Sequence, residues 1–325
     1  MNQKRNALSL KEFFLPMIII LLSGTLQVSC NVTPQSYIIT YNSNAGTGTI
    51  PNPQTKMFRE TLTIAPNSGN LQKVDYTFDG WNTESDGSGT FYATGSDYNL
   101  DESVTLYAQW SEIFSTTENE GKLEITAFHG TGTEVTIPQT INDKPVTSIG
   151  QNVFRDRTNI TSITIPESVT SIGNFAFFRC SNLTSITIPE GVTLIGSHVF
   201  MLSGLTNITI PSSVITLNSC AFNECGNLAE ISILGATSIG TNAFWNCVGL
   251  TTVSMPNIIS LGDKAFDHCT SLESILIPDS VLTVGSYIFC AASSLTDINC
   301  ESDSKPSNWD QYWNSGYDTI THWGQ

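Results

Sequence analysis

The sequence predicts a mainly β protein in which a small β domain is followed by a solenoid of 22- to 23-residue coils. Two observations carry this prediction. Seven phenylalanines recur at intervals of 23, 23, 22, 22, 22 and 23 residues: Phe154, Phe177, Phe200, Phe222, Phe244, Phe266 and Phe289. The residues between them repeat the pattern L-x-x-I-x-I-P-x-x-V-x-x-I-G-x-x-A-F-x-x-C with small variations. Such a fixed period is typical of proteins in which each repeat stacks on the next.

Composition narrows the class of protein. The 325 residues include 13 lysines and arginines and 29 acidic residues, a formal net charge of −16, and 40% are hydrophobic. This apolar content excludes a disordered chain. An acidic surface repels phosphate backbones, so the composition argues against nucleic-acid binding.

Residues 1–29 have the layout of a lipoprotein-type signal peptide. Lys4, Arg5 and Lys11 precede an apolar run at residues 13–22, and small and polar residues follow. Ten residues extend about 15 Å as a helix, about half of a membrane's hydrocarbon core. We therefore expect this run to be removed as a signal rather than kept as a transmembrane anchor.

Cys30 follows this segment and is the expected site of lipid attachment. Residues 26–30 resemble a bacterial lipobox, in which a small residue precedes the cysteine that receives diacylglycerol after cleavage. Gln27 departs from the usual Leu-like residue, and ordinary cleavage without lipidation is the alternative. Acyl chains would anchor Cys30 in the membrane, with residues 30–36 as a tether. The chain is then expected in the bacterial cell envelope, exposed on the surface; without lipidation it would be secreted.

Residues 37–110 are interpreted as a small β domain. Short alternating runs such as 37–41 and 104–108 predict about four strands joined by turns. The segment resembles the Listeria–Bacteroides repeat of internalin-like surface proteins, on Tyr41, the turn 46–48, Pro51, and residues 76–83, 86–90 and 106–110. The resemblance implies a β-grasp-like fold. We expect Trp81 and Trp110 in the core, because a domain this small needs large apolar side chains.

Each coil of the repeat is expected to contain two short strands. In the row that begins at Leu183, alternation predicts a strand that ends at Pro189, and residues 192–195 predict a second strand. A turn, or a single helical turn, then places Phe200 inside. Burying the inward side chains of one coil contributes on the order of 10 kcal/mol. That is less than the entropic cost of ordering 22 residues, at about 1 to 2 kcal/mol each. Coils therefore fold only as a stack.

The repeat resembles the BspA-like leucine-rich-repeat proteins of bacterial surfaces. Residues 137–150 are similar to the first coil of that family, which carries an insertion between its Pro and its Val. The resemblance covers residues 112–325. It implies an N-terminal cap at 112–136, a leucine-rich-repeat solenoid at 137–299, and a role in adhesion to host matrix proteins, host cells or other bacteria.

Aromatic side chains gather again in the C-terminal segment, residues 300–325. They are Trp309, Tyr312, Trp313, Tyr317 and Trp323. We expect them to cap the open end of the hydrophobic stack. The alternative is an exposed platform for a ligand.

Seven cysteines follow Cys30, and four of them share one column of the repeat: Cys180, Cys225, Cys247 and Cys269. We expect buried free thiols that act as small apolar side chains. One disulfide between neighbouring coils, such as Cys225 with Cys247, is the alternative. Zinc is not expected, because Cys220 and Cys225 lack a second close pair of ligands.

The outward positions on the first strand of each coil form the candidate binding face. They are polar and almost uncharged: Ser162, Thr164, Ser185, Thr187, Asn207, Thr209, Glu230, Ser232, Thr252 and Ser254. No residues have the spacing of a known catalytic, cofactor or metal motif. The sequence therefore predicts a non-enzymatic protein that needs no cofactor.

We interpret this face as the surface with which a monomeric protein binds a protein partner. That partner is a host matrix or cell-surface protein, or another bacterium. A structural spacer of the cell envelope without a dedicated ligand is the second hypothesis. Glu230 and Leu276 interrupt the threonine array that ice binding would need, and the array has no aromatic platform for a sugar.

Overall fold

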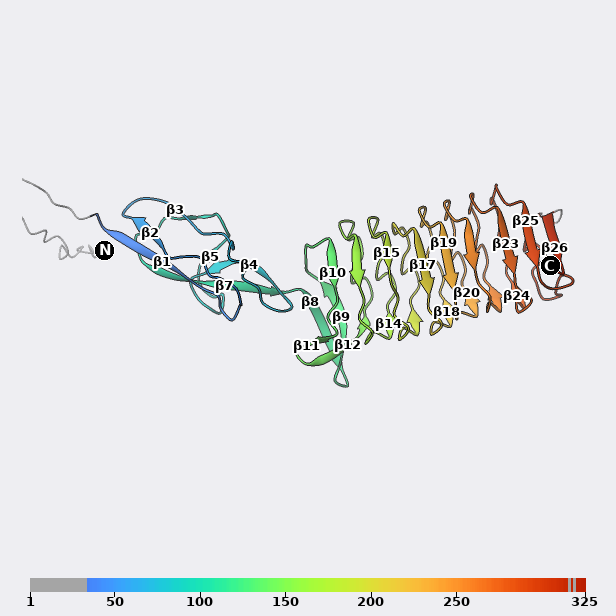
Figure 1. The fold of residues 1–325 in the computed structure, drawn as a ribbon, viewed down its shortest axis with the longest axis horizontal. Helices are drawn as coiled ribbons and strands as arrows, with labels where there is room; N and C mark the ends of the chain where they lie inside the picture. Colours follow the sequence, from blue (N-terminus) through green and yellow to red (C-terminus); the bar gives the residue numbers. More distant parts are fainter. Residues whose placement is uncertain (1–33, 315–316, 318–319) are drawn as a thin grey trace, which may run out of the picture. The chain divides into compact units, whose positions relative to one another are not determined.

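The computed structural model describes residues 34–314, 317 and 320–325, so the expected signal peptide and Cys30 lie outside the described residues. Every regular element assigned to the described residues is a β-strand, which confirms the predicted class (Figure 1). None of them forms a helix of the length and apolarity that a membrane crossing requires. The chain divides into two compact units: residues up to Gln72 with Phe78–Gln109, and Lys73–Thr77 with Trp110–Gln325.

The first unit contains a five-stranded mixed sheet with the order β2-β1-β7-β4-β5, and a two-stranded ribbon of β3 and β6. β1 and β7 run parallel, with Tyr41 opposite Leu106. The structure has more strands than the expected four, because several are two residues long and show no alternation. Their bounds are β1 (Ser36–Asn42), β2 (Gln54–Met57), β3 (Leu62–Thr63), β4 (Tyr76–Asn82), β5 (Phe91–Tyr92), β6 (Asp97–Tyr98) and β7 (Val104–Glu112).

Trp81 is the centre of this unit's core, as expected. It is fully buried, its ring lies 4.6 Å from the Tyr41 ring, and its indole N–H donates to the carbonyl of Ala65 at 3.0 Å. Trp110 does not join the core and is half-buried at the outer end of β7. The expectation was wrong for Trp110, because composition shows that a small domain needs large side chains but not which of them point inward.

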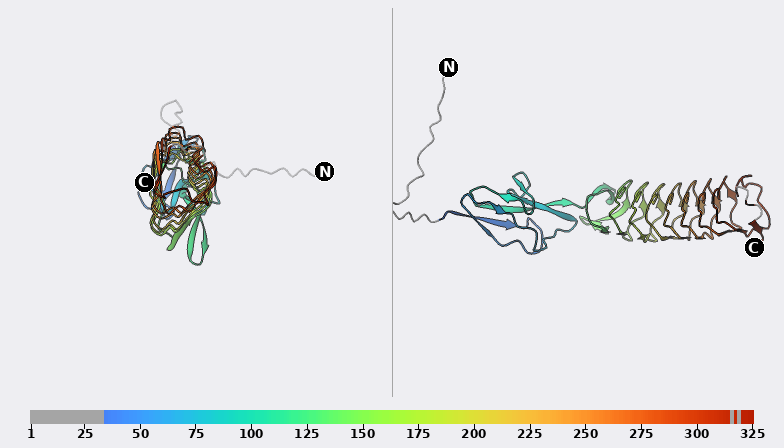
Figure 2. Two further views of the ribbon diagram at one scale, coloured as in Figure 1. Left: turned by 90° about the vertical axis from the view of Figure 1, so that its right-hand side faces the viewer. Right: turned by 90° about the horizontal axis from the view of Figure 1, so that it is seen from above.

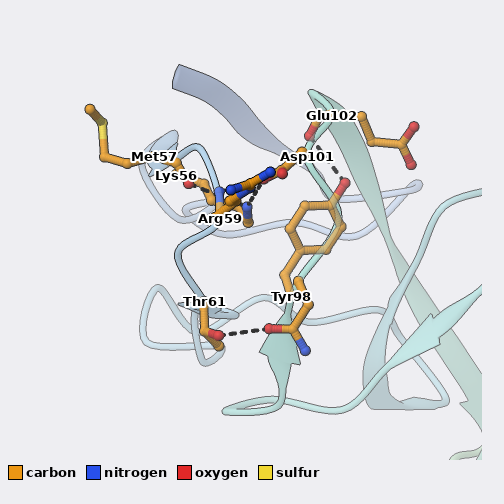
Figure 3. Close-up of polar contacts among 8 residues, drawn as sticks. Lys56, Met57, Arg59, Thr61, Tyr98, Asp101 and Glu102 are labelled. Atoms are coloured by element: carbon orange, nitrogen blue, oxygen red, sulfur yellow. Dashed lines mark hydrogen bonds and ion pairs between the residues drawn. The ribbon is translucent and has the colours of Figure 1, made fainter. Parts of the chain in front are cut away.

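A buried lysine is the unexpected feature of this unit (Figure 3). The Lys56 side chain is inaccessible to solvent, and its ammonium donates to Asp101 Oδ1 at 2.6 Å and to the carbonyl of Met57 at 3.3 Å. The backbone N–H of Arg59 donates to the same carboxylate oxygen at 2.9 Å. The hydrogen bond from Lys56, and then that from Arg59, lowers the pKa of Asp101. The pair thus ties β2 to the segment that follows β6.

In the second unit, the first strands of successive coils stack on one side of the ribbon and the second strands on another (Figures 1 and 2). The first strands are β10 (Glu134–Thr136), β13 (Ser162–Thr164), β15 (Ser185–Ile186), β17 (Asn207–Ile210), β19 (Glu230–Ile233), β21 (Thr252–Ser254), β23 (Ser274–Ile277), β25 (Asp297–Cys300) and β26 (Thr321–Trp323). The second strands are β9 (Lys122–Phe128), β12 (Lys144–Ile149), β14 (Ser171–Ile172), β16 (Leu194–Ile195), β18 (Thr216–Leu217), β20 (Ser238–Ile239), β22 (Ser260–Leu261) and β24 (Thr283–Val284).

The two sides differ in continuity. The second strands form one parallel ladder from β9 to β24, with pairs such as Ser171 opposite Leu194. The first strands form three separate sheets, β10-β13-β15, β17-β19-β21 and β23-β25-β26. The first break coincides with a shortened row, in which Phe200 and Leu205 are one residue closer in sequence than Phe177 and Leu183. Repetition therefore predicts the stack but not every hydrogen bond in it.

The phenylalanine column lies at the centre of the stack, as the sequence predicts. All seven rings are fully buried. Rings in consecutive coils lie 5.2 to 6.0 Å apart between centroids, with interplanar angles of 1° to 17°. These values fall in the range of offset-stacked aromatic pairs. A parallel backbone ladder accompanies the rings, for example from Phe222 N–H to the Ala243 carbonyl at 2.8 Å.

Left-handed residues shape the turn around each phenylalanine. The residue two places before it has φ between 54° and 62° in every coil: Asn152, Phe175, His198, Cys220, Asn242, Lys264 and Tyr287. The residue two places after it has φ between 56° and 60°: Asp156, Arg179, Leu202, Glu224, Asn246, His268 and Ala291. The segment around each of these phenylalanines is a turn rather than the single helical turn that was the other expectation. The left-handed backbone conformation costs a residue other than glycine about 1 to 2 kcal/mol. Among such residues, asparagine is one of those that tolerate it best.

Both ends of the stack are closed. At the N-terminal end, β8 (Phe114–Asn119) pairs with β9, and the rings of Phe114, Phe128 and Phe154 continue the column at 5.5 and 5.2 Å. The expected insertion is a hairpin of β11 (Thr140–Ile141) and β12. At the other end, Trp309 and Trp313 are buried, and Trp313 lies 6.4 Å from Phe289. Burial of these tryptophans supports the interpretation as a cap over that as a platform, although Tyr312 is exposed.

The repeat cysteines are free thiols, and the described residues contain no disulfide. Each of the four column cysteines donates its S–H to the carbonyl of the phenylalanine one coil back, for example Cys247 to Phe222 at 3.0 Å. Burial raises the pKa of Cys180 to about 12 and that of Cys225 to about 11. The thiols therefore stay protonated and act as small core side chains, as expected.

Removing one ring from the column tests how much it contributes. We expect Phe222→Ala to lower the free energy of unfolding by about 3 to 5 kcal/mol, because it removes contacts with Phe200 and Phe244 on both sides. Equilibrium denaturant unfolding followed by circular dichroism measures this. Thr209→Ala, on the exposed surface, is the matched control and should change stability by less than about 0.5 kcal/mol. A loss of less than about 1 kcal/mol for Phe222→Ala would contradict the role of the column.

The ion pair of the first unit predicts a dependence on pH. The folded-state pKa of Asp101 is lowered, so its stabilisation is present above the unfolded-state pKa, about 3.9, and is lost as pH falls through the folded-state value. We expect Asp101→Asn to lower the melting temperature at neutral pH, because it leaves the Lys56 ammonium buried without a carboxylate. The difference in melting temperature between Asp101→Asn and the wild type should become smaller as the pH is lowered. Asp97→Asn, at an exposed position, should leave the melting temperature unchanged; a similar drop there would refute the explanation.

Candidate functional site

The ten residues predicted as a binding face all lie on the first-strand side of the solenoid. We call them the strand face. Eight are exposed, and Ser162 and Ser232 are half-buried. The alternation of each strand explains this, because the residues between them, such as Ile163 and Ile231, point into the core.

The structure divides the strand face between two sheets. Ser162, Thr164 and Ser185 lie on β13 and β15, with Thr187 just beyond β15. The other six share the sheet of β17, β19 and β21. There, register places Glu230 between Asn207 and Thr252, and Ser232 between Thr209 and Ser254. A compact two-by-three array of polar side chains results, and we call it the central array.

The central array has polar groups available for contacts. Among the described contacts, its hydroxyls on Thr209, Ser232, Thr252 and Ser254 have no hydrogen-bond partner within the chain. A neighbouring threonine column differs, because its hydroxyls donate to the carbonyl one coil back. The threonine hydroxyls that donate to the preceding coil stabilise the stack, whereas the hydroxyls of the central array remain available to bind another molecule.

Exposed aliphatic residues on the opposite sheet were not predicted as a surface feature. Leu194, Ile215, Ile259 and Leu282 have 41% to 57% of their surface exposed. Ile215, Ile259 and Leu282 share one column of the repeat, the residue just before the second strand. Earlier coils have threonine in this column, as at Thr170 and Thr193. The repeat pattern leaves this column unspecified. Comparing its residues from row to row would have revealed the aliphatic side chains.

A second unpredicted feature is a cluster of arginine and phenylalanine at the turns of the first coils. We call Arg155, Phe175, Phe178 and Arg179 the Arg–Phe ridge. The Arg155 guanidinium lies 4.7 Å from the Phe178 ring centroid and 5.6 Å from that of Phe175. The Arg179 guanidinium lies 5.8 Å from Phe178, and the two rings meet edge to face at 5.8 Å. These residues occupy columns on either side of the buried phenylalanine, which the sequence pattern leaves open.

The histidines and carboxylates of the described residues have few polar contacts with one another. Among the described residues, no group of three histidine, cysteine, aspartate or glutamate side chains is placed to hold a metal ion. His268 Nδ1 contacts the carboxylate of its neighbour Asp267 at 2.6 Å, and His322 Nε2 lies 3.4 Å from Asp297. Burial lowers the pKa of His198, which therefore stays neutral at physiological pH.

Comparison with known proteins identifies a family for the first unit and relatives of the chain. Residues 37–109 match the Listeria-Bacteroides repeat domain, which confirms the resemblance of the first unit. A protein of Evansella cellulosilytica, provisionally named a Gly-rich membrane protein, is 38% identical over 95 residues. The match spans 28% of this chain and 11% of that protein. A second protein of the same organism, provisionally named a membrane protein, is 36% identical over 31% of this chain and 14% of its own length.

This chain is also similar to solved structures of leucine-rich-repeat proteins. One from T. pallidum is 24% identical, with a TM-score of 0.45 over 49% of this chain and 88% of that chain. One from Eubacterium ventriosum is 27% identical, with a TM-score of 0.49 over 58% of this chain and 48% of that chain.

The family itself is shown by the repeats. Residues 147–260 and 234–321 match the BspA type leucine rich repeat region, in six copies. These two segments overlap and together cover residues 147–321, more than half of the chain. They include every buried phenylalanine from Phe154 to Phe289. The protein therefore belongs to the BspA type leucine rich repeat family.

Proposed function

We propose that this protein is a lipid-anchored adhesin of the bacterial surface whose solenoid binds a protein partner through the strand face. The central array is the observation that carries the proposal. It presents hydroxyl, amide and carboxylate groups at fixed spacing on a sheet. The inward-facing side chains of that sheet, such as Ile208 and Ile231, are buried in the core. Directional polar contacts on a rigid frame lose little conformational entropy when a partner binds.

The composition of the array favours a protein over other ligands. Its one charged side chain is Glu230, and hydroxyl and amide groups can both donate to and accept from a peptide backbone. A sugar would need an aromatic platform. Ice binding would need an unbroken lattice, which Glu230 interrupts. The second candidate function, a spacer of the envelope, draws support from the closed ends of the stack, which make the solenoid a self-contained rigid rod.

Lipid attachment at Cys30 is the other part of the proposal. The sequence of residues 26–30 supports it, and the first unit then stands between the anchor and the solenoid in the chain order. Anchoring by acyl chains would keep the strand face outside the cell while leaving the protein attached.

Binding to matrix proteins tests the strand face. We expect residues 31–325, immobilised by the N-terminus, to bind fibronectin, laminin or fibrinogen saturably at micromolar concentration in surface plasmon resonance. Thr209→Arg together with Thr252→Arg should weaken that binding at least tenfold, about 1.4 kcal/mol, because two long side chains cover the central array. Thr216→Arg together with Thr283→Arg places two arginines on the opposite sheet and should have no effect. Absence of saturable binding to all three proteins would favour the spacer.

Metabolic labelling tests the anchor. We expect the full-length protein expressed in a bacterial host to incorporate radiolabelled palmitate and to fractionate with membranes. Cys30→Ala should abolish labelling and release the protein, whereas Cys220→Ala, at a half-buried position in the solenoid, should leave labelling unchanged. If the wild-type protein is cleaved but carries no label, the segment is an ordinary signal peptide and Cys30 is not lipidated.

A further inference from the structure

The Arg–Phe ridge gathers positive charge on a protein that is otherwise acidic. Residues 145–325 contain five lysines and arginines and fourteen acidic residues, a balance of 5 − 14 = −9. All three arginines of this segment lie within residues 155–179. Residues 180–325 contain two lysines and twelve acidic residues, a balance of 2 − 12 = −10. The ridge is therefore a local cationic site beside a long acidic surface.

The ridge arginines are accessible and only partly neutralised. Their side chains are 44% and 58% exposed. Asp156 serves both, at 3.3 Å from Arg155 Nε and 3.6 Å from Arg179 Nη1. Arg157 points elsewhere, because its guanidinium donates to the carbonyl of Phe128 and lies over that ring. Two exposed guanidinium groups sharing one carboxylate leave donors for a further anion.

Phe175 has a backbone conformation that disfavours bulky side chains. Its φ of 57° is left-handed; the same column has asparagine, which tolerates that conformation, at Asn152 and Asn242, and an aromatic residue again at Tyr287. The ring is half-buried, contacts Phe178, and stacks on the His198 ring at 4.5 Å and 17°. It keeps part of its surface exposed and lies 5.6 Å from the Arg155 guanidinium, so it can add an apolar contact beside the cation.

We propose that the Arg–Phe ridge docks an acidic segment of a partner protein, with carboxylates on Arg155 and Arg179 and an adjacent aromatic or aliphatic side chain on Phe175 and Phe178. Arginine and aromatic residues are the types that dominate binding energy at protein interfaces. Guanidinium groups bind carboxylates through paired hydrogen bonds. This inference rests on the proposed function in one respect: it takes the ligand of the solenoid to be a protein.

The chemistry of the ridge favours this occupant over a nucleic acid. A nucleic acid would need cations along its length, and the acidic surface beyond residue 180 repels it. A short acidic segment needs to contact only the ridge, and salt screens its repulsion by charges farther away than about 8 Å at physiological ionic strength. A second copy of this chain could offer its own acidic surface to the ridge, so the experiment must separate self-association from partner binding.

Fluorescence anisotropy with a defined probe tests the ridge. The protein is residues 31–325, and the probe is a labelled random copolymer of glutamate and tyrosine. We expect saturable binding that weakens as salt is raised. Arg155→Gln with Arg179→Gln should weaken it at least tenfold, whereas Lys264→Gln with Lys305→Gln removes the same charge elsewhere and should change it less than about twofold. Polyglutamate without tyrosine should bind more weakly, because it leaves the phenylalanine rings uncovered.

Phe175→Asn keeps the proposal falsifiable if the arginine variants fold poorly. Asparagine suits the left-handed backbone, so the variant should fold, which circular dichroism checks, while affinity for the copolymer falls about fivefold. Three results would overturn the proposal: no copolymer binding, equal binding by the two double variants, or unchanged binding by Phe175→Asn. Concentration-dependent self-association in sedimentation that the arginine variants abolish, without copolymer binding, would assign the ridge to a second copy and also overturn it.

The two surfaces fail separately in these experiments. If the ridge is wrong but the strand face is right, matrix proteins bind, Thr209→Arg with Thr252→Arg prevents it, and the copolymer does not bind. If the strand face is wrong but the ridge is right, the copolymer binds and responds to Arg155→Gln with Arg179→Gln, while the strand-face variants change nothing.

Discussion

Contact between neighbouring coils is the constraint on which the rest of this structure depends. One coil buries too few apolar side chains to offset the entropy of ordering its backbone. Stacking supplies what is missing, since each phenylalanine ring is covered by the next and each turn donates backbone hydrogen bonds to its neighbour. Stability then becomes a property of neighbours rather than of a single core. Ends are the weak points of such an arrangement, and Phe114 at one end and Trp313 at the other close them.

This constraint separates structure from function within each row. Inward columns must hold the same residue types in every coil, because a changed volume would leave a cavity in a continuous stack. Outward columns are released from that demand. The polar strand face, the aliphatic residues of the opposite sheet and the Arg–Phe ridge all occupy such columns. The left-handed turns contribute as well: they hold Phe175 and Arg179 at the surface of a rigid frame instead of on a flexible loop.

The first unit is stabilised in another way. Without a repeat to extend its core, it closes a short mixed sheet with Trp81 and Tyr41, and it buries the charged end of Lys56 beside Asp101. Removing either partner of such a pair leaves a charge poorly solvated, so the pair specifies one arrangement of β2 and the segment after β6. Contacts between distant parts of its sequence, such as Tyr41 with Leu106 and Lys56 with Asp101, therefore hold the first unit together, while the solenoid relies on repetition.

Periodicity by itself determined the class of fold, the buried phenylalanine column, the shared buried position of the repeat cysteines and the outward direction of the strand face. Side chains repeated at a constant interval must occupy equivalent places in a stack. Tertiary structure alone decided the features that depend on contacts between residues of different rows or segments. It placed Trp110 outside the core, divided the first strands into three sheets, and joined Arg155 and Arg179 of adjacent coils through one phenylalanine ring. The physical reason is that a pattern shared by all rows carries no information about positions at which the rows differ, and it is at those positions that the proposed binding surfaces lie.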